Sequence, residues 1–170
     1  FHHPVDIAER IATLDALHDG STFFGVGAGY RDVEFEAFGV PKSQRIPRLE
    51  EGLELATRLL SEESVSYSGE FYSIEDATIS VRADDVSVWM AGNSNAAVER
   101  AARLTDAWMV NPHSTISEIR AQKEGHYDPV RRDRGQDTNV PIIREAFVAS
   151  SHDEAVATAR DYLWEKYQSY

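Results

Sequence analysis

The sequence predicts an α/β fold in which short buried strands alternate with amphipathic helices. Apolar residues at helical spacing recur between compact apolar runs, the runs end in turns of small or polar residues, and no internal repeat interrupts the alternation. This alternation is typical of parallel βα units, which build either a doubly wound open sheet or part of a (β/α)8 barrel. In both architectures ligands bind where the strands end.

The first third of the chain predicts a strand between two helices. Residues 4–18 have helical spacing, with a proline in the first turn where its missing N–H is tolerated. Residues 22–26 form a compact strand that runs into the turn Gly27-Ala28-Gly29. Residues 31–44 are expected to be a loop with a helical turn, and residues 46–60 an amphipathic helix.

Residues 62–85 predict a β-hairpin insertion. The residues alternate in polarity over 65–74 around Gly69, and residues 77–81 predict a further short strand. We favour a surface insertion without chemistry for this segment.

Residues 86–102 predict the centre of a ligand site. Residues 86–90 are apolar enough for a strand buried on both faces, and Gly92 allows a sharp turn. Asn93, Ser94 and Asn95 are good N-cap residues before an alanine-rich helix that runs to about residue 104. Such a helix start offers free N–H groups and the positive end of the helix dipole, which suits a phosphate. An ordinary capped turn is the competing interpretation.

The next strand, over 106–112, is expected to stop at Asn111 and His113. Thr115 and Glu118 then form a capping-box pattern for a helix over 116–127. The arginine-rich residues 129–139 predict a solvated helix end and loop, although three close arginines could also meet an anionic group.

Residues 141–149 predict a strand that carries Arg144 at a position able to face the barrel interior. An inward Arg144 could neutralise an anionic substrate or cofactor tail; a buried ion pair with an acidic residue is the alternative. A last helix is capped by Ser151 and Glu154, with an expected apolar side of Ala155, Ala159, Tyr162, Leu163 and Tyr167.

Composition restricts the partners. The net charge of −12 and the pI near 4.8 oppose binding to nucleic acid or an anionic membrane. The chain has no cysteine, which excludes disulfides and thiolate chemistry. A small-molecule substrate, a cytoplasmic location and a possible homodimer are expected. The acidic, lysine-poor composition also fits a halophile, with an ordinary acidic protein as the alternative.

The histidines of the chain raise the alternative of a metal-dependent hydrolase. His2, His3 and His113 lack the spacing of a metal-binding motif, so we predict no metal site.

Seven motifs follow one another along nearly the whole chain. They read HPVxxAExxATLDxL from His3, GVGAGY from Gly25, EFEAFGVP from Glu34, RLEEGLE from Arg48, GEFY from Gly69, WMAGNS from Trp89 with RAARLTDAW from Arg100, and REAFVA from Arg144. In this order they resemble the bacterial luciferase-like family of flavin- and deazaflavin-dependent oxidoreductases.

The resemblance implies a partial TIM barrel over residues 1–170, a single domain that starts with the helix after barrel strand 3 and ends with the helix after strand 7. A complete barrel takes about 250 residues. The family's usual active-site histidine comes from the early strands, so the catalytic residues of this chain are unknown.

The resemblance also implies a cofactor-phosphate site. Its residues would be Gly27, Ala28 and Gly29 in one turn and Ala91, Gly92, Asn93 and Ser94 in the other. Ala28 stands where some members have an arginine or glutamate, which leaves the cofactor open between FMN and a deazaflavin coenzyme. Asn111, His113 and Arg144 are the candidate substrate residues.

Three functions follow from this resemblance. The first is a monooxygenase that uses reduced FMN and oxygen to oxygenate a small organic substrate. The second is a deazaflavin-dependent reductase or dehydrogenase that transfers a hydride. The third, from another class, is a flavin-binding protein without turnover or an inactive barrel fragment.

Overall fold

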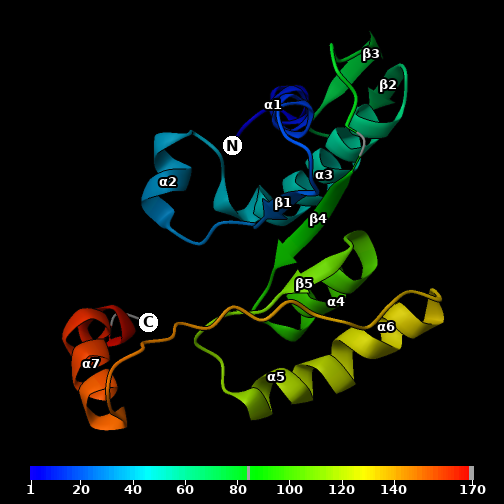
Figure 1. Ribbon diagram of the computed structural model, residues 1–170. Helices are drawn as coiled ribbons and strands as arrows, with labels where there is room; N and C mark the ends of the chain where they lie inside the picture. The colour runs from blue at the N-terminus through cyan, green and yellow to red at the C-terminus, as the bar shows by residue number, and fades with distance from the viewer. Residues whose placement is uncertain (84, 169–170) are drawn as a thin grey trace.

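Three parallel strands form the central sheet of the computed structural model, which describes residues 1–83 and 85–168 (Figure 1). The strands are β1 (Thr22–Val26), β4 (Val86–Ala91) and β5 (Ala107–Met109), and they lie in that order. The register pairs Val26 with Met90 and Ala91 with Met109. The three strands predicted along this part of the chain are therefore confirmed, the last one shorter than expected.

Helices pack on one face of this sheet. Val88 and Met90 of β4 are buried in the same cluster as Leu53 of α3 (Arg45–Ser61) and Val98 of α4 (Asn95–Leu104). Consecutive crossover helices on one face of a sheet with sequential strand order are typical of a barrel wall, whereas a doubly wound sheet has helices on both faces. The structure is thus an α/β fragment whose parallel strands, in sequential order, are covered by helices on one face.

The other face of the sheet presents aromatic side chains. Phe23 is 59% exposed there, and its ring centroid lies 4.5 Å from that of Trp89 on the neighbouring strand. Side chains on a strand alternate between faces, so these two residues lie opposite the helix-packed Phe24 and Val88.

The remaining helical elements follow the sequence patterns closely. The His3 ring accepts the Val5 N–H at the start of α1, and Thr115 and Glu118 form the predicted capping box of α5. The elements are α1 (Pro4–Ala16), α2 (Asp32–Ala37), a 3-10 turn (Lys42–Gln44), α5 (Ile116–Gln122), a π-helical turn (Lys123–Tyr127), α6 (Asp128–Asp133) and α7 (His152–Gln168). The predicted loop over 31–44 is thus partly helical.

The predicted hairpin is present as β2 (Val65–Ser68) paired antiparallel with β3 (Ser73–Ala77). The further strand predicted over 77–81 is wrong. Asp76 has a φ of 47°, the ladder ends at Ala77, and Ile79 packs instead on the second apolar cluster with Leu55 and Leu59. Residue 84, within the predicted insertion, lies outside the described residues, and the single-domain organisation over 1–170 stays a prediction.

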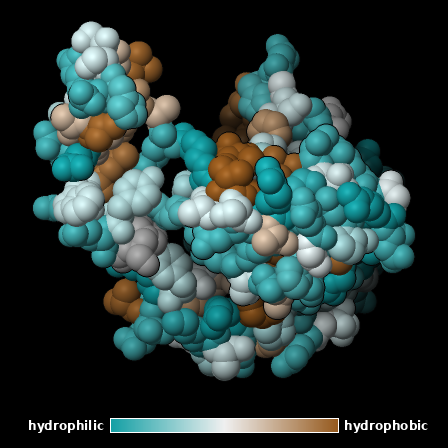
Figure 2. Space-filling model, turned by 90° about the horizontal axis from the view of Figure 1, so that it is seen from below, coloured by the Kyte–Doolittle hydropathy of each residue, from teal (hydrophilic) through white to brown (hydrophobic). Residues whose placement is uncertain are grey.

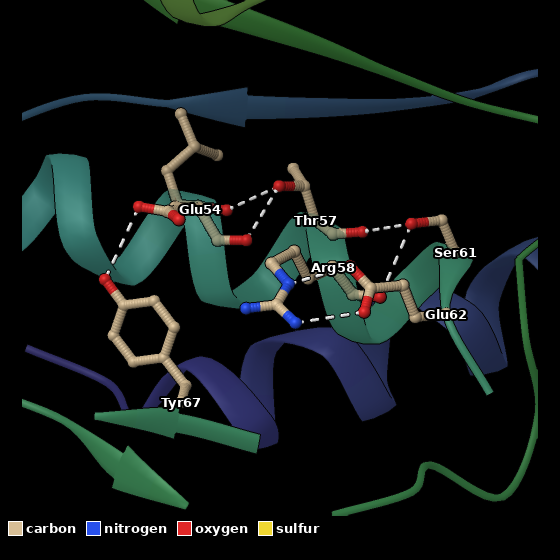
Figure 3. A network of polar contacts seen from close by, with 7 residues as sticks. Glu54, Thr57, Arg58, Ser61, Glu62 and Tyr67 are labelled. Carbon is tan, nitrogen blue, oxygen red and sulfur yellow. Dashed lines mark hydrogen bonds and ion pairs between the residues drawn. The ribbon is translucent and has the colours of Figure 1, made fainter. Parts of the chain in front are cut away.

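A hydrogen bond ties the hairpin to the outer face of α3, whose own side chains form further polar contacts along the helix (Figure 3). The Tyr67 hydroxyl donates to Glu54 Oε2 at 3.4 Å, and the Arg58 guanidinium binds both oxygens of Glu62, at 2.7 and 3.0 Å. This bidentate hydrogen bonding lowers the pKa of the Glu62 carboxyl. These bonds lie on the polar side of α3, opposite its packed side.

The strand predicted over 141–149 is wrong. Only one bridge joins this segment to the sheet, between Val110 and Ile142, and Val148 is 99% exposed. The apolar residues of the segment fit a strand pattern, but a strand also needs a neighbour along its length, and β5 ends at Met109.

The prediction of a solvated segment over 129–139 is also wrong for Arg131. Arg131 is buried and donates to the carbonyl oxygens of Thr105 and Asp137, at 2.9 and 2.7 Å, and to Gln136 Oε1 at 3.0 Å. Its neighbours Arg132 and Arg134 are exposed, as expected. The Arg131 guanidinium therefore fixes the segment that follows α6 against Thr105, between α4 and β5.

The last helix, α7, projects from the rest of the structure (Figures 1 and 2). Its predicted start is confirmed by a hydrogen bond from the Glu154 N–H to Ser151 Oγ. On its predicted apolar side, Tyr162 is 76% exposed. Within residues 1–83 and 85–168, the helices are too short or too polar to cross a membrane.

Candidate functional site

The two predicted turns lie side by side at the carboxyl edge of the sheet. Gly27 follows β1 and Ala91 ends β4, and these strands are paired in parallel. A β-carbon at Gly27 would lie 3.9 Å from the Ala91 β-carbon, and Gly29 has a φ of +71°. We call residues 27–29 and 91–94 together the phosphate corner. The structure brings the seven predicted residues to one edge.

Gly92 is required by close packing against α4. A β-carbon at residue 92 would lie 2.8 Å from the Ala97 β-carbon and 3.0 Å from the Ala97 carbonyl carbon. The Gly92 carbonyl oxygen accepts a 2.9 Å hydrogen bond from Trp108 Nε1, which is buried. This side of the turn therefore faces protein, and the tight approach holds it against the helix start.

Ser94 is the N-cap of α4, as the sequence predicts. Its hydroxyl accepts the Ala97 N–H at 3.3 Å, and its backbone is extended. Asn95 and Ala96, the first two residues of the helix, are exposed. An N-cap side chain satisfies only one or two of the four free N–H groups at a helix start, so donors are left for a ligand.

Gln122 of α5 stabilises the corner from a neighbouring element. Its Nε2 donates to the Asn93 carbonyl oxygen at 2.8 Å and to Asn95 Oδ1 at 3.3 Å. Neither Gln122 nor Trp108 is among the site residues predicted from the sequence. A buried indole N–H needs an acceptor, which is a signal that Trp108 would bond nearby, but nothing local in the sequence identifies Gln122.

The residues present fit a bound phosphate. Beside the corner lie the first-turn N–H groups of the exposed residues Asn95 and Ala96 and the positive end of the ten-residue α4, and the Ser94 hydroxyl retains a donor hydrogen while it accepts from Ala97. None of its seven residues carries a charge, so the donors are backbone N–H groups, the Ser94 hydroxyl and the Asn93 side-chain amide.

The predicted substrate residues also gather, next to β5. Asn111 Oδ1 accepts the His113 N–H at 2.9 Å, and Arg144 donates to the carbonyl oxygens of Pro112 and Ser114, at 2.5 and 2.8 Å. The His113 ring contacts that of Tyr167, with centroids 4.7 Å apart. Arg144 thus holds the loop that carries His113, from a segment outside the sheet.

The predicted absence of a metal site concerns the histidines and the acidic residues. Among residues 1–83 and 85–168, no three histidine or acidic side chains are arranged to hold a metal ion. His3 caps α1, and the His2 ring lies 6.1 Å from that of Phe38.

Comparison with known families agrees with this geometry. The family model described as luciferase-like monooxygenase matches residues 1–169. The chain belongs to this family. The family resemblance seen in the sequence motifs is therefore confirmed.

Curated relatives of this luciferase-like chain include two F420-dependent glucose-6-phosphate dehydrogenases. That of Kineococcus radiotolerans is 29% identical over 157 residues, which are 90% of this chain and 42% of the relative. That of Segniliparus rotundus is 31% identical over 144 residues, which are 79% of this chain and 42% of the relative.

Solved structures show the fold. The monooxygenase RslO1 of Streptomyces bottropensis matches with a TM-score of 0.85 at 24% identity, over 99% of this chain and 53% of RslO1. An F420-dependent secondary alcohol dehydrogenase in complex with an F420–acetone adduct matches with a TM-score of 0.69 at 19% identity, over 95% of this chain and 51% of the other. The luciferase-like chain thus spans about half the length of these proteins, and its sheet matches half of a barrel.

Proposed function

We propose that this chain forms the phosphate-binding corner of an oxidoreductase that works with a reduced flavin or deazaflavin. The observation that carries the proposal is the capped start of α4 beside the turn after β1, at the carboxyl edge of a parallel sheet. Ligands of βα barrels bind at this edge. Membership of the luciferase-like family supports the redox class.

The corner residues have distinct roles in this proposal. The N–H groups of Asn95 and Ala96 and the Ser94 hydroxyl donate to phosphate oxygens. Gly27 offers an approach without a side chain. Trp108 and Gln122 keep the turn in place through the carbonyl oxygens of Gly92 and Asn93.

Two cofactors are compatible with this corner. When bound, reduced FMN supplies electrons for oxygen activation, and a deazaflavin supplies a hydride. The F420-dependent relatives at 29% and 31% identity favour the deazaflavin as the first candidate. FMN is the second candidate because the family model is that of a monooxygenase.

The substrate side of the proposed site is the loop after β5. Arg144 fixes the loop through two backbone carbonyls and keeps His113 next to Tyr167. We propose that His113 and Asn111 contact the substrate and that Arg144 positions them.

The cofactor assignment is tested by equilibrium binding to the 170-residue chain. FMN and F420 are titrated separately against the unaltered chain, Ser94→Ala and Ser61→Ala. Ser61 is a matched control, because, among the residues that the structure describes, its hydroxyl bonds only to carbonyl oxygens of its own helix. We expect Ser94→Ala to weaken binding of the preferred cofactor by about tenfold and Ser61→Ala to leave it unchanged.

Three results have defined meanings. Preferential binding of F420 supports the hydride-transfer form, and preferential binding of FMN supports the oxygen-dependent form. No binding of either cofactor to a chain that melts cooperatively contradicts the proposal and favours an inactive fragment.

A further inference from the structure

A cavity of about 320 Å³ lies between α1, β1 and α3. Its walls are mostly apolar, with Ile7 from α1, Phe24 from β1 and Leu49 and Leu53 from α3. Phe35 of α2 and Tyr72 of the hairpin add aromatic surface. The cavity shares residues 27–29 with the phosphate corner but is lined by none of the residues 91–94, so it extends from the corner toward α1 and α3.

Two arginines line this otherwise apolar cavity. Arg45 and Arg48 are both half-buried, one turn apart at the start of α3. Neither forms an ion pair with a carboxylate of the described residues. The bonds that Arg48 does make leave charge available: its Nε donates to Gln44 Oε1 at 2.9 Å, and its guanidinium stacks 4.5 Å from the Phe71 ring centroid.

The pairing of these two arginines differs from that of the other arginines in the described ranges. The arginines without an ion pair are otherwise either exposed or bonded to backbone carbonyls. The exposed ones are Arg82, Arg120, Arg134 and Arg160, and the carbonyl-bonded ones are Arg131 and Arg144. A chain with a net charge of −12 has many carboxylates available, yet Arg45 and Arg48 are partly desolvated without one. Half-buried cations favour an anionic partner.

The hairpin holds this arrangement in place. Glu51, one turn after Arg48, accepts the N–H groups of Phe71 and Tyr72 at 3.0 and 2.8 Å. This contact sets the Phe71 ring against Arg48 and places Tyr72 in the cavity wall. The hairpin therefore forms part of the cavity wall.

We infer that the cavity between α1 and α3 binds an aromatic organic anion, a carboxylate or sulfonate whose ring lies among the apolar side chains and whose charge meets Arg45 and Arg48. Aromatic walls contact a flat ring favourably edge-on or in offset stacking. Guanidinium groups bind oxyanions by charge-assisted hydrogen bonds, often bidentate. Binding here requires neither a flavin nor turnover.

The test is calorimetric titration of the 170-residue chain with 1-naphthalenesulfonate and with neutral 1-naphthalenemethanol. We expect the sulfonate to bind at one site and the alcohol at least about tenfold more weakly, because one charge-assisted contact is worth about a factor of ten. Arg45→Gln and Arg48→Gln are each expected to weaken sulfonate binding about tenfold. Arg120→Gln, which removes the same charge from an exposed position of α5, is the matched control and leaves it unchanged.

A second variant separates the cavity from the charge. Ala56 is buried in the cavity wall, and Ala56→Leu reduces the space for the ring while both arginines are kept. Loss of sulfonate binding in this variant, with an unchanged melting transition, supports the assignment. Equal binding of alcohol and sulfonate, an equal loss in Arg120→Gln, or full displacement by saturating FMN would overturn it. If Ala56→Leu does not fold, the two arginine variants decide the question.

Discussion

The carboxylate of Glu51 lies against Gly69 so closely that a β-carbon at residue 69 would stand 2.1 Å from Glu51 Oε1. Glu51 accepts the N–H groups of Glu70, Phe71 and Tyr72, the three residues after this glycine. The sequence motifs RLEEGLE and GEFY therefore contact each other in the folded chain, through Glu51 of the first and the backbone of the second. This one carboxylate, with no side chain opposite it at Gly69, supplies three of the hydrogen bonds that hold the hairpin to α3, beside the Tyr67–Glu54 bond and the Arg48–Phe71 contact.

Gly69→Ala should destabilise the chain by about 1–3 kcal/mol, because its new methyl group displaces Glu51 from the hairpin. Glu51→Gln keeps one acceptor oxygen and should cost less than Glu51→Ala. Urea unfolding measures both effects. If all three variants were as stable as the unaltered chain, the contact between Glu51 and the hairpin would not hold the hairpin in place.

Gly92→Ala should cost about 1–3 kcal/mol, because the added methyl group overlaps the backbone of Ala97. Gly125→Ala is the control: a β-carbon there has no described atom within 4 Å, and its position is helical. The control should be neutral or up to about 1 kcal/mol more stable. Thermal unfolding of the two variants is the measurement. A loss of stability in Gly92→Ala alone identifies overlap with Ala97, whereas similar changes in both variants identify a general effect of replacing glycine.

Arg131→Met should destabilise the chain by about 2–4 kcal/mol, since it leaves the carbonyl oxygen of Thr105 without this donor in a buried position and removes the part-buried bond to the Asp137 carbonyl. Arg134→Met removes the same charge from an exposed position and should change stability by no more than about 0.5 kcal/mol. Denaturant titration of both variants is the measurement. Similar losses in the two would contradict a specific role for Arg131.

Alkaline pH should destabilise the chain through Tyr127. Burial raises the pKa of the Tyr127 hydroxyl above its ordinary value of 10.0. Above pH 10 the unfolded chain loses this proton while the folded chain keeps it, so the free energy of unfolding falls as pH rises.

Tyr127→Phe should reduce that loss, because it removes the hydroxyl whose pKa burial raises. Tyr162→Phe, at an exposed position, should leave the pH profile unchanged. Unfolding measured from pH 8 to 11 tests this. Part of the slope should persist, since burial also raises the pKa of Tyr67.

Much of the fold could be predicted because its signals are local. The strands at 22–26 and 86–90, the capping box at Thr115 and the Ser94 cap depend on residues within a few positions of each other. The phosphate corner could be placed for the same reason: parallel strands end at one edge, so the turns after β1 and β4 meet there.

The wrong predictions concern residues whose surroundings are distant in sequence. The pattern of residues 141–149 suits a strand, but pairing needs a neighbour, and only Val110 offers one bridge. Arg131 has the same local context as its exposed neighbours and is buried because Thr105, 26 positions earlier, lies above it.

The sequence by itself determined the three strands of the central sheet with their flanking helices, the family, and the two turns that meet at the sheet edge, because periodicity, capping and turn chemistry act over short distances. Only the tertiary structure decided that Glu51 binds the hairpin, that Arg45 and Arg48 share an apolar cavity, and that Arg144 holds the His113 loop from outside the sheet. The Glu51 and Arg144 contacts join residues about 20 or more positions apart, and the cavity combines residues from α1, β1 and α3, so tertiary packing sets their distances.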